Sequence, residues 1–207
     1  MRLVALVCLA VASLSTAEPL AIPLAVSVTV VLDFEQAPHS VPLATVQQEL
    51  RNILAPSGLR IDVRVRNELP RDPEFQQLVI FKMKGHCTTE PVFVEALSDE
   101  RGALAMTYTS DGELLPFGEV ECDGLRRSLA RVYGPSAGDR HSIEFGTAVA
   151  RVMAHEIYHM IGNSKTHTRN GISKESLSAR ELSGRSLQLD KQAQAVVRDR
   201  VRSQDRH

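Results

Sequence analysis

The sequence predicts an α+β sandwich, with an α/β arrangement as the alternative, followed by a small helical lobe at the C-terminal end. Three observations lead to this fold class. Short β-branched or alternating segments recur in the first half of the chain, two segments have the helical period, and a polar helical segment follows a turn-rich stretch. The 207 residues are enough for one domain with its own core. We therefore expect a single domain over residues 18–207.

The first 17 residues have the layout of a secretory signal peptide. Arg2 precedes an apolar run that ends near Leu14, and the small residues Ser15 and Ala17 stand just before Glu18. This is the order of charged, apolar and cleavage regions in exported proteins. A membrane anchor is the alternative, but it needs about 20 apolar residues and this run is shorter. We expect cleavage after Ala17 and a secreted or periplasmic protein.

The first predicted elements alternate between strands and a helix. Residues 24–34 are rich in β-branched side chains and predict a strand. Residues 43–55 carry apolar side chains at helical spacing. Residues 59–66 alternate apolar and polar side chains, which is typical of a strand with one buried face. Residues 75–84 predict a third strand.

The second half begins with irregular chain and ends in helices. Residues 103–109 predict a short edge strand, and residues 118–125 are a candidate for one more. Residues 142–162 have a broad apolar face, which predicts a largely buried helix. A polar helix and its charged tail are predicted over residues 177–207, where Ser178 and a glutamate three residues later fit a capping box.

Two cysteines, Cys87 and Cys122, remain after the predicted cleavage. A pair of cysteines in an exported chain predicts one disulfide. Two free thiols or two metal ligands are the alternatives, but the long gap between the cysteines fits no compact cysteine-based zinc site.

Charge and hydropathy exclude several classes of partner. The formal net charge is −1, which gives no reason to expect nucleic acid or an anionic membrane as partner. No segment after the N-terminal run is long and apolar enough for a transmembrane helix. We expect a monomer without membrane contact once the signal peptide is removed.

The predicted helix over residues 142–162 contains the sequence HEIYH. Because His155 and His159 are four residues apart, their imidazoles leave the same face one turn apart. Two such nitrogens can reach one metal ion at about 2.0–2.1 Å, the usual Zn–N distance. Glu156, about 100° around the helix from His155, is suited to deprotonate a metal-bound water. The pattern predicts two zinc ligands and a general base; a buried helix whose histidines bond to backbone carbonyls without a metal is the alternative.

A catalytic zinc ion usually has three protein ligands and an open position. Gly162 follows the second histidine by three residues and is predicted to end the helix in a left-handed turn. That turn would return the chain across the metal toward His167, our candidate for the third ligand. Glu175 and Glu181, from a second helix, are the alternatives, and Cys122 is a further one if it forms no disulfide.

The sequence HEIYHMIG with a histidine nearby resembles the signature of the metzincin zinc endopeptidases, the matrixin-like ones in particular, which is His-Glu-x-x-His-x-x-Gly-x-x-His. The last position of that signature holds Lys165, and His167 stands two residues later. Metzincins also place a methionine in a turn beneath the metal. This chain has no methionine after Met160, and Leu177 is the candidate for that place. The matching positions are His155, Glu156, His159 and Gly162.

The resemblance implies a metzincin-like sandwich, with a twisted mixed sheet of four or five strands and two long helices. It implies peptide-bond hydrolysis at one zinc ion by an activated water, with Glu156 as the general base. It also implies a peptide or protein substrate that pairs with the edge strand by strand addition. Tyr158, elsewhere on the helix, is expected in the core. The edge-strand residues are Leu104, Ala105, Met106, Thr107 and Tyr108.

Two other functions remain open at this point. The first is a secreted zinc-binding protein without turnover, and the second is an interaction domain without a metal. Glu156 argues against the first, because a structural zinc site needs no general base and usually closes with four protein ligands. No feature of the sequence favours the second.

Overall fold

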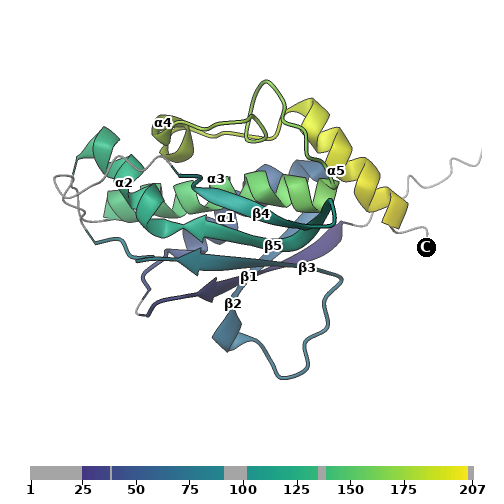
Figure 1. Ribbon diagram of the computed structural model, residues 1–207, viewed down its shortest axis with the longest axis horizontal. Coiled ribbons are helices and arrows are strands. Elements are labelled where there is room, and N and C mark those ends of the chain that lie inside the picture. Colours follow the sequence, from purple (N-terminus) through teal and green to yellow (C-terminus); the bar gives the residue numbers. More distant parts are fainter. Residues whose placement is uncertain (1–24, 38, 91–101, 135–138, 205–207) are drawn as a thin grey trace, which may run out of the picture.

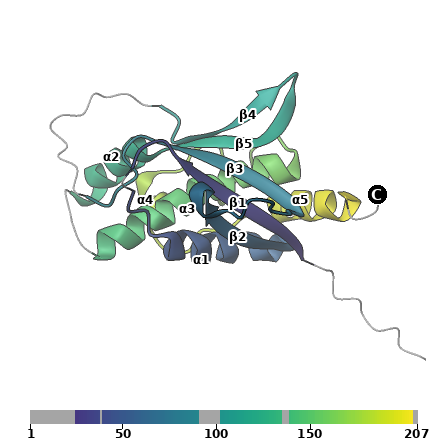
Figure 2. The same cartoon turned by 90° about the horizontal axis from the view of Figure 1, so that it is seen from below.

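The computed structural model describes residues 25–37, 39–90, 102–134 and 139–204. The predicted signal peptide lies outside these ranges. The described chain forms one five-stranded mixed sheet, with α1 and α3 running along one face of it (Figures 1 and 2). The prediction of a mixed sheet of four or five strands with helices is therefore confirmed. No helix in the described ranges is long and apolar enough to cross a membrane.

The N-terminal part is a parallel unit built from β1 (Val26–Phe34), α1 (Leu43–Leu54) and β2 (Leu59–Val65). β1 pairs in parallel with β2, so the chain must cross over between them, and α1 is that crossover. Gly58, at φ 82°, makes the left-handed turn that ends the helical stretch before β2. β3 (Gln77–Lys84) pairs in parallel with the other side of β1. These strands match their predicted ranges to within two residues.

The other half of the sheet is a hairpin formed by β4 (Ala105–Ser110) and β5 (Glu113–Glu121). β5 pairs in parallel with β3, and β4 pairs antiparallel with β5, which gives the strand order β2-β1-β3-β5-β4. The hairpin turn has positive φ at Asp111 and Gly112, as tight two-residue turns require. β4 is therefore an edge strand of the sheet, and its outer edge is unpaired within the described chain.

A helix that the sequence analysis missed follows β5 directly. The candidate strand over residues 118–125 is wrong beyond Glu121, because α2 (Cys122–Tyr133) begins there. Leu125 and Leu129 are one turn apart, and both are fully buried, so this segment buries its apolar side chains with the period of a helix. A disulfide joins Cys87 to Cys122, as predicted, and ties the chain after β3 to the start of α2.

The long helix α3 (Asp139–Gly162) crosses the molecule between the sheet and the C-terminal segments (Figure 1). It starts earlier than the predicted residue 142. Its apolar side chains point both to the sheet and to the surrounding helices, which is why the predicted apolar face is broad. The following members are completely buried: Phe145, Val149, Met153 and Ile157.

The predicted C-terminal helix is two helices, α4 (Ala179–Ser183) and α5 (Lys191–Gln204). The capping box at the start of α4 is present as predicted, with reciprocal bonds between Ser178 and Glu181. The break after α4 lies at Gly184, where a Cβ atom would stand 2.4 Å from the carbonyl oxygen of Arg180. A new cap at Asp190, whose carboxylate accepts from the Ala193 amide, then starts α5.

Candidate metal centre

The buried helix α3 presents His155 and His159 one turn apart on the same face. Their Nε2 atoms lie 3.0 Å apart. Two nitrogens bound to one zinc ion in a tetrahedral site lie about 3.3 Å apart, from Zn–N distances near 2.0–2.1 Å. The helix alone therefore brings two donor atoms to a separation suited to one metal ion.

Backbone carbonyls fix which nitrogen of each ring is free. Nδ1 of His155 bonds to the carbonyl oxygen of Ile172 at 2.8 Å, and Nδ1 of His159 bonds to that of Ser164 at 2.5 Å. A carbonyl oxygen only accepts, so both Nδ1 atoms carry the proton and both Nε2 atoms present a lone pair. Two facing lone pairs repel each other, and a cation between them removes the repulsion. Hydrogen bonds from the nitrogen that does not bind the metal also hold metal-binding imidazoles in orientation.

Burial favours the neutral form of both imidazoles. It lowers the pKa of His155, against the opposing effect of the bond to Ile172. It also lowers the pKa of His159, against the bond to Ser164. A neutral imidazole is the form that binds a metal, so the burial of this face favours the ligand state at neutral pH.

The end of α3 returns the chain toward the two histidines, but the left-handed residue is Asn163 and not Gly162. Asn163 has φ 46°, and the amide of Ser164 bonds to the carbonyl oxygen of His159, as in a Schellman ending. Asparagine tolerates this conformation. Gly162 has another role: a Cβ atom there would lie 3.2 Å from Val196, so its absence allows α5 to pack closely.

The segment after Asn163 carries His167 to the two helix histidines. One ligand atom from each of His155, His159 and His167 lies within 4.8 Å of the others. His167 is exposed at the surface, and its ring centroid lies 5.2 Å from that of His155 and 4.9 Å from that of His159. The structure therefore brings the three predicted ligands together, and this group of imidazoles fits one zinc ion with an open position.

The alternative third ligands are placed differently. Glu181 pairs with Lys174 and takes part in the capping box of α4. Glu175 is exposed on the rim of a pocket, and Cys122 is in the disulfide. Among the described residues, the group of at least three metal-ligating side chains that lie close enough to share an ion is the three histidines.

Glu156 lies beside the histidines and is 7% exposed. Burial raises the pKa of this carboxyl group, while a hydrogen bond from the Thr107 side chain lowers it. The Thr107 hydroxyl donates to Oε2 of Glu156 at 2.7 Å. Thr107 belongs to the edge strand β4, so the strand predicted to bind substrate touches the predicted general base.

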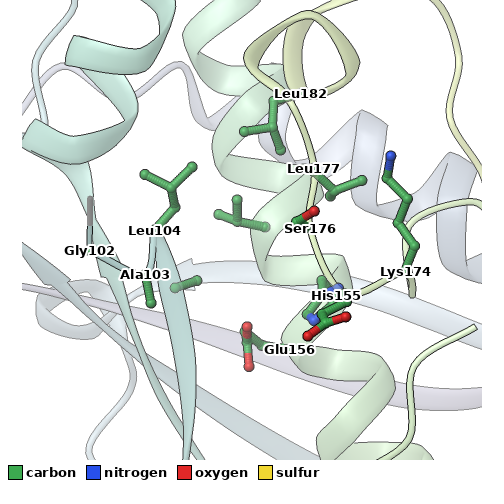
Figure 3. Close-up of a pocket in the computed structure, with 12 residues that line it drawn as sticks. Gly102, Ala103, Leu104, His155, Glu156, Lys174, Ser176, Leu177 and Leu182 are labelled. Atoms are coloured by element: carbon green, nitrogen blue, oxygen red, sulfur yellow. The ribbon is translucent and has the colours of Figure 1, made fainter.

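A pocket of about 300 Å³ opens beside Glu156 and His155. Leu182 lies at the end of the pocket away from Glu156 (Figure 3). Ala105 and Leu104 of the predicted substrate strand also line it, whereas Met106 and Tyr108 are exposed. The proposed replacement for the metzincin methionine, Leu177, is another lining residue. The apolar side chains that line it are Ala103, Leu104, Ala105, Val152, Leu177 and Leu182, and the polar ones include Lys174, Glu175 and Ser176.

Three residues around the site make contacts that the sequence did not predict. Lys165 donates from Nζ to the carbonyl oxygen of Gly112, which ties the loop that carries His167 to the hairpin turn. Tyr158, buried as expected, donates to the carbonyl oxygen of Thr166 at 2.9 Å and holds the same loop from inside. Thr107 contacts Glu156 from 49 positions away in the chain. Contacts at such separations follow no local spacing.

Comparison with known proteins identifies similar structures. No protein-family model and no curated protein sequence matches the chain. A zinc-dependent peptidase from Methanocorpusculum labreanum (strain Z) aligns at 17% identity and a TM-score of 0.47, over 81% of this chain and 99% of that one. Archaemetzincin from Methanopyrus kandleri aligns at 12% identity and a TM-score of 0.50, over 88% and 99%. The chain shares the fold of archaemetzincin.

Proposed function

We propose that this protein is an exported zinc-dependent endopeptidase. The observation that carries the proposal is the convergence of three imidazoles beside the Glu156 carboxyl group. His155 and Glu156 line a pocket next to β4, whose outer edge is unpaired within the described chain. The structural similarity to archaemetzincin from Methanopyrus kandleri supports it. Export rests on the N-terminal sequence and on the disulfide, which is typical of oxidising compartments.

A bound zinc ion would supply Lewis-acid chemistry, because it polarises a carbonyl oxygen and makes a water molecule acidic. His155, His159 and His167 would hold the ion. Glu156 would accept a proton at Oε1 and pass it to the leaving amine, since its Oε2 already accepts the Thr107 hydroxyl. The burial that raises the pKa of Glu156 makes this carboxylate a better base than an exposed one.

The substrate would be an extended peptide. The outer edge of β4 offers backbone groups for strand addition. A side chain next to the scissile bond would enter the pocket, whose apolar lining favours an apolar side chain. The unpaired strand edge and the pocket together distinguish this site from a zinc site with a structural role only.

The proposal is tested with Glu156→Gln, which keeps the shape of the side chain and removes its basicity. We expect the variant to bind one zinc ion as tightly as the wild type and to lose hydrolysis of an unstructured protein by about 10²–10⁴-fold or more. Glu144→Gln is the matched control, because it is the same change on the same helix, at a residue that pairs with Arg140. Zinc content is measured by metal analysis and hydrolysis by the release of peptides.

The outcomes separate the candidate functions. A wild type that holds zinc without cleaving peptides is a zinc-binding protein without turnover, and a wild type without zinc leaves only an interaction domain. Equal hydrolysis by wild type and Glu156→Gln would show that Glu156 is not the base.

A further inference from the structure

We propose that Thr107 is a positioning residue for Glu156: its hydroxyl fixes the carboxylate in one orientation, so that Oε1 is directed to the reacting water. This inference rests on the proposed function, in which Glu156 is the general base. It adds a role for the side chain of the edge strand, which strand addition alone does not use, because strand addition needs only backbone groups.

The contact between Thr107 and Glu156 is a well-formed hydrogen bond. The separation of 2.7 Å between Oγ1 and Oε2 is the ordinary distance for a hydroxyl donor. An ionised carboxylate only accepts, so the hydroxyl must be the donor. The backbone of Thr107 also hydrogen-bonds to the carboxylate of Glu156, and both bonds lower its pKa. Thr107 therefore holds this carboxylate through its hydroxyl at Oε2 and through its backbone.

The sheet is shaped so that Thr107 faces α3. Ala105 and Thr107 are half-buried and alternate with the exposed Met106 and Tyr108, so Thr107 lies on the face that packs against the helix. The pairing register between β4 and β5 then shifts between Thr107 and Thr109. Such an irregularity redirects a strand, and it is common next to active sites. The regular pairing thus ends just after the residue that contacts Glu156.

The partner of Thr107 on β5 is Gly118, and a larger residue would not fit there. A Cβ atom on Gly118 would lie 2.7 Å from the carbonyl oxygen of Met106 and 2.8 Å from Cε of Met160. The missing side chain allows β4, β5 and α3 to approach each other closely. This close packing brings the hydroxyl of Thr107 within reach of a carboxylate on a different element.

The chemistry explains why a fixed orientation matters. A glutamate side chain has several rotatable bonds, and each wrong rotamer removes the base from the reacting water. Threonine is suited to the task because its β-branched side chain has a restricted χ1 and presents the hydroxyl in a defined direction. A hydroxyl that merely stabilises a buried carboxylate is the competing explanation. That explanation predicts a loss of stability with a wild-type kcat in the folded protein, whereas a positioning role predicts a loss of kcat.

The experiment compares Thr107→Val, which removes the hydroxyl with little change of shape, with Thr107→Ser, which keeps it. In the zinc-loaded protein we expect Thr107→Val to lower kcat by about 10- to 100-fold, with little change in KM. This is the usual loss when a residue that orients a group at a metal site is changed. Thr107→Ser should restore most of kcat. Zinc affinity should be the same in all variants, and kcat is compared at a temperature at which every variant is fully folded. Thr29→Val, the same change at a half-buried threonine of β1 away from the site, should leave kcat unchanged.

A second readout does not depend on turnover. In crystal structures, the Glu156 carboxylate should keep one orientation in Thr107→Ser and adopt more than one in Thr107→Val. If Thr107→Val does not fold, Thr107→Ala removes the same hydroxyl. A wild-type kcat in the valine or alanine variant, or a serine variant as slow as the valine variant, would overturn the inference. An inactive wild type overturns the proposed function instead, and the orientation of Glu156 in the variants then decides this inference alone.

Discussion

The helix α3 and the segment over residues 163–190 both contribute to the metal centre, but they hold their ligands by different means. In α3, the helical repeat itself sets the spacing of His155 and His159. The following segment has one short helix and isolated bridges as its regular structure. Its ligand, His167, lies in place because side chains elsewhere hold the loop.

The contacts that hold the segment are mostly made to α3 or within the segment. Tyr158 and Arg151, both buried in α3, donate to carbonyl oxygens of the segment. Thr168 and Ser173 bond to each other through their hydroxyls at 2.7 Å. The carbonyl oxygen of Ile172 then accepts a hydrogen bond from Nδ1 of His155. The helix α3 therefore has two roles. One face carries two ligands, and Tyr158 and Arg151 hold the segment that carries His167.

The largest expected effect is on zinc binding, and it tests whether the two regions contribute equally. Changing a residue that hydrogen-bonds to a metal ligand lowers metal affinity by roughly 10–100-fold. Removing a ligand itself should lower zinc affinity by more than that. We expect His159→Ala and His167→Ala each to exceed that loss, measured by competition with a chelator. If only the helix histidine matters, His167→Ala will bind zinc as the wild type does.

Two glutamates serve as controls for the third ligand. Glu175→Gln and Glu181→Gln should keep wild-type zinc affinity, because neither lies in the histidine group. A weakened affinity in one of them, together with normal binding by His167→Ala, would assign the third position to that glutamate.

The next largest effect concerns the anchor between the regions. Arg151 is 1% exposed, and its guanidinium bonds to Glu49 at 2.8 Å and to the carbonyl oxygens of Glu181 and Arg185. Arg151→Met leaves the Glu49 carboxylate without its cation, and breaking a buried pair in this way costs about 3–5 kcal/mol. We therefore expect urea unfolding to give a free energy of unfolding about 3–5 kcal/mol lower for Arg151→Met than for the wild type.

The control for Arg151 is an exposed arginine on the same helix. Arg140 pairs with Glu144 but its side chain is 87% exposed, so Arg140→Met should cost at most about 1 kcal/mol. Similar values for both variants would mean that Arg151 is not the anchor.

The strands and the helix ligands could be predicted from the sequence because local periodicity determines them. β1 to β3 and α3 bury one face or most of their surface, so their apolar spacing is regular. The pair His155 and His159 follows from the helical repeat alone. The disulfide was predicted from the expected signal peptide and the count of cysteines.

The remaining features depend on contacts between distant segments. α2 was missed because Glu121, before its first residue, makes no side-chain cap, so the usual start signal is absent. The split between α4 and α5 depends on backbone packing at Gly184. The left-handed turn was assigned to Gly162 because glycine is the common residue there, yet Asn163 takes that conformation and Gly162 serves the packing of α5.

The smallest expected effect tests how weakly a single contact holds the C-terminal segment. Lys174 and Ser178 hold the pKa of Glu181 at about 2, below its ordinary value of 4.5. A lowered pKa in the folded state stabilises the protein above about pH 4.5, and this contribution is lost as the pH falls toward 2. The pair is partly exposed, so solvent reduces its value to less than about 1 kcal/mol.

Glu181→Gln isolates this contribution, because an amide oxygen can still accept the bonds of the capping box. Urea unfolding should show wild type more stable than the variant at pH 7, with the difference shrinking between pH 4.5 and 2. Added salt should reduce the difference at pH 7, as for any exposed ion pair. A difference that persists at pH 2, or exceeds that of Arg151→Met, would mean that surface contacts anchor the segment and that α3 is not its main support.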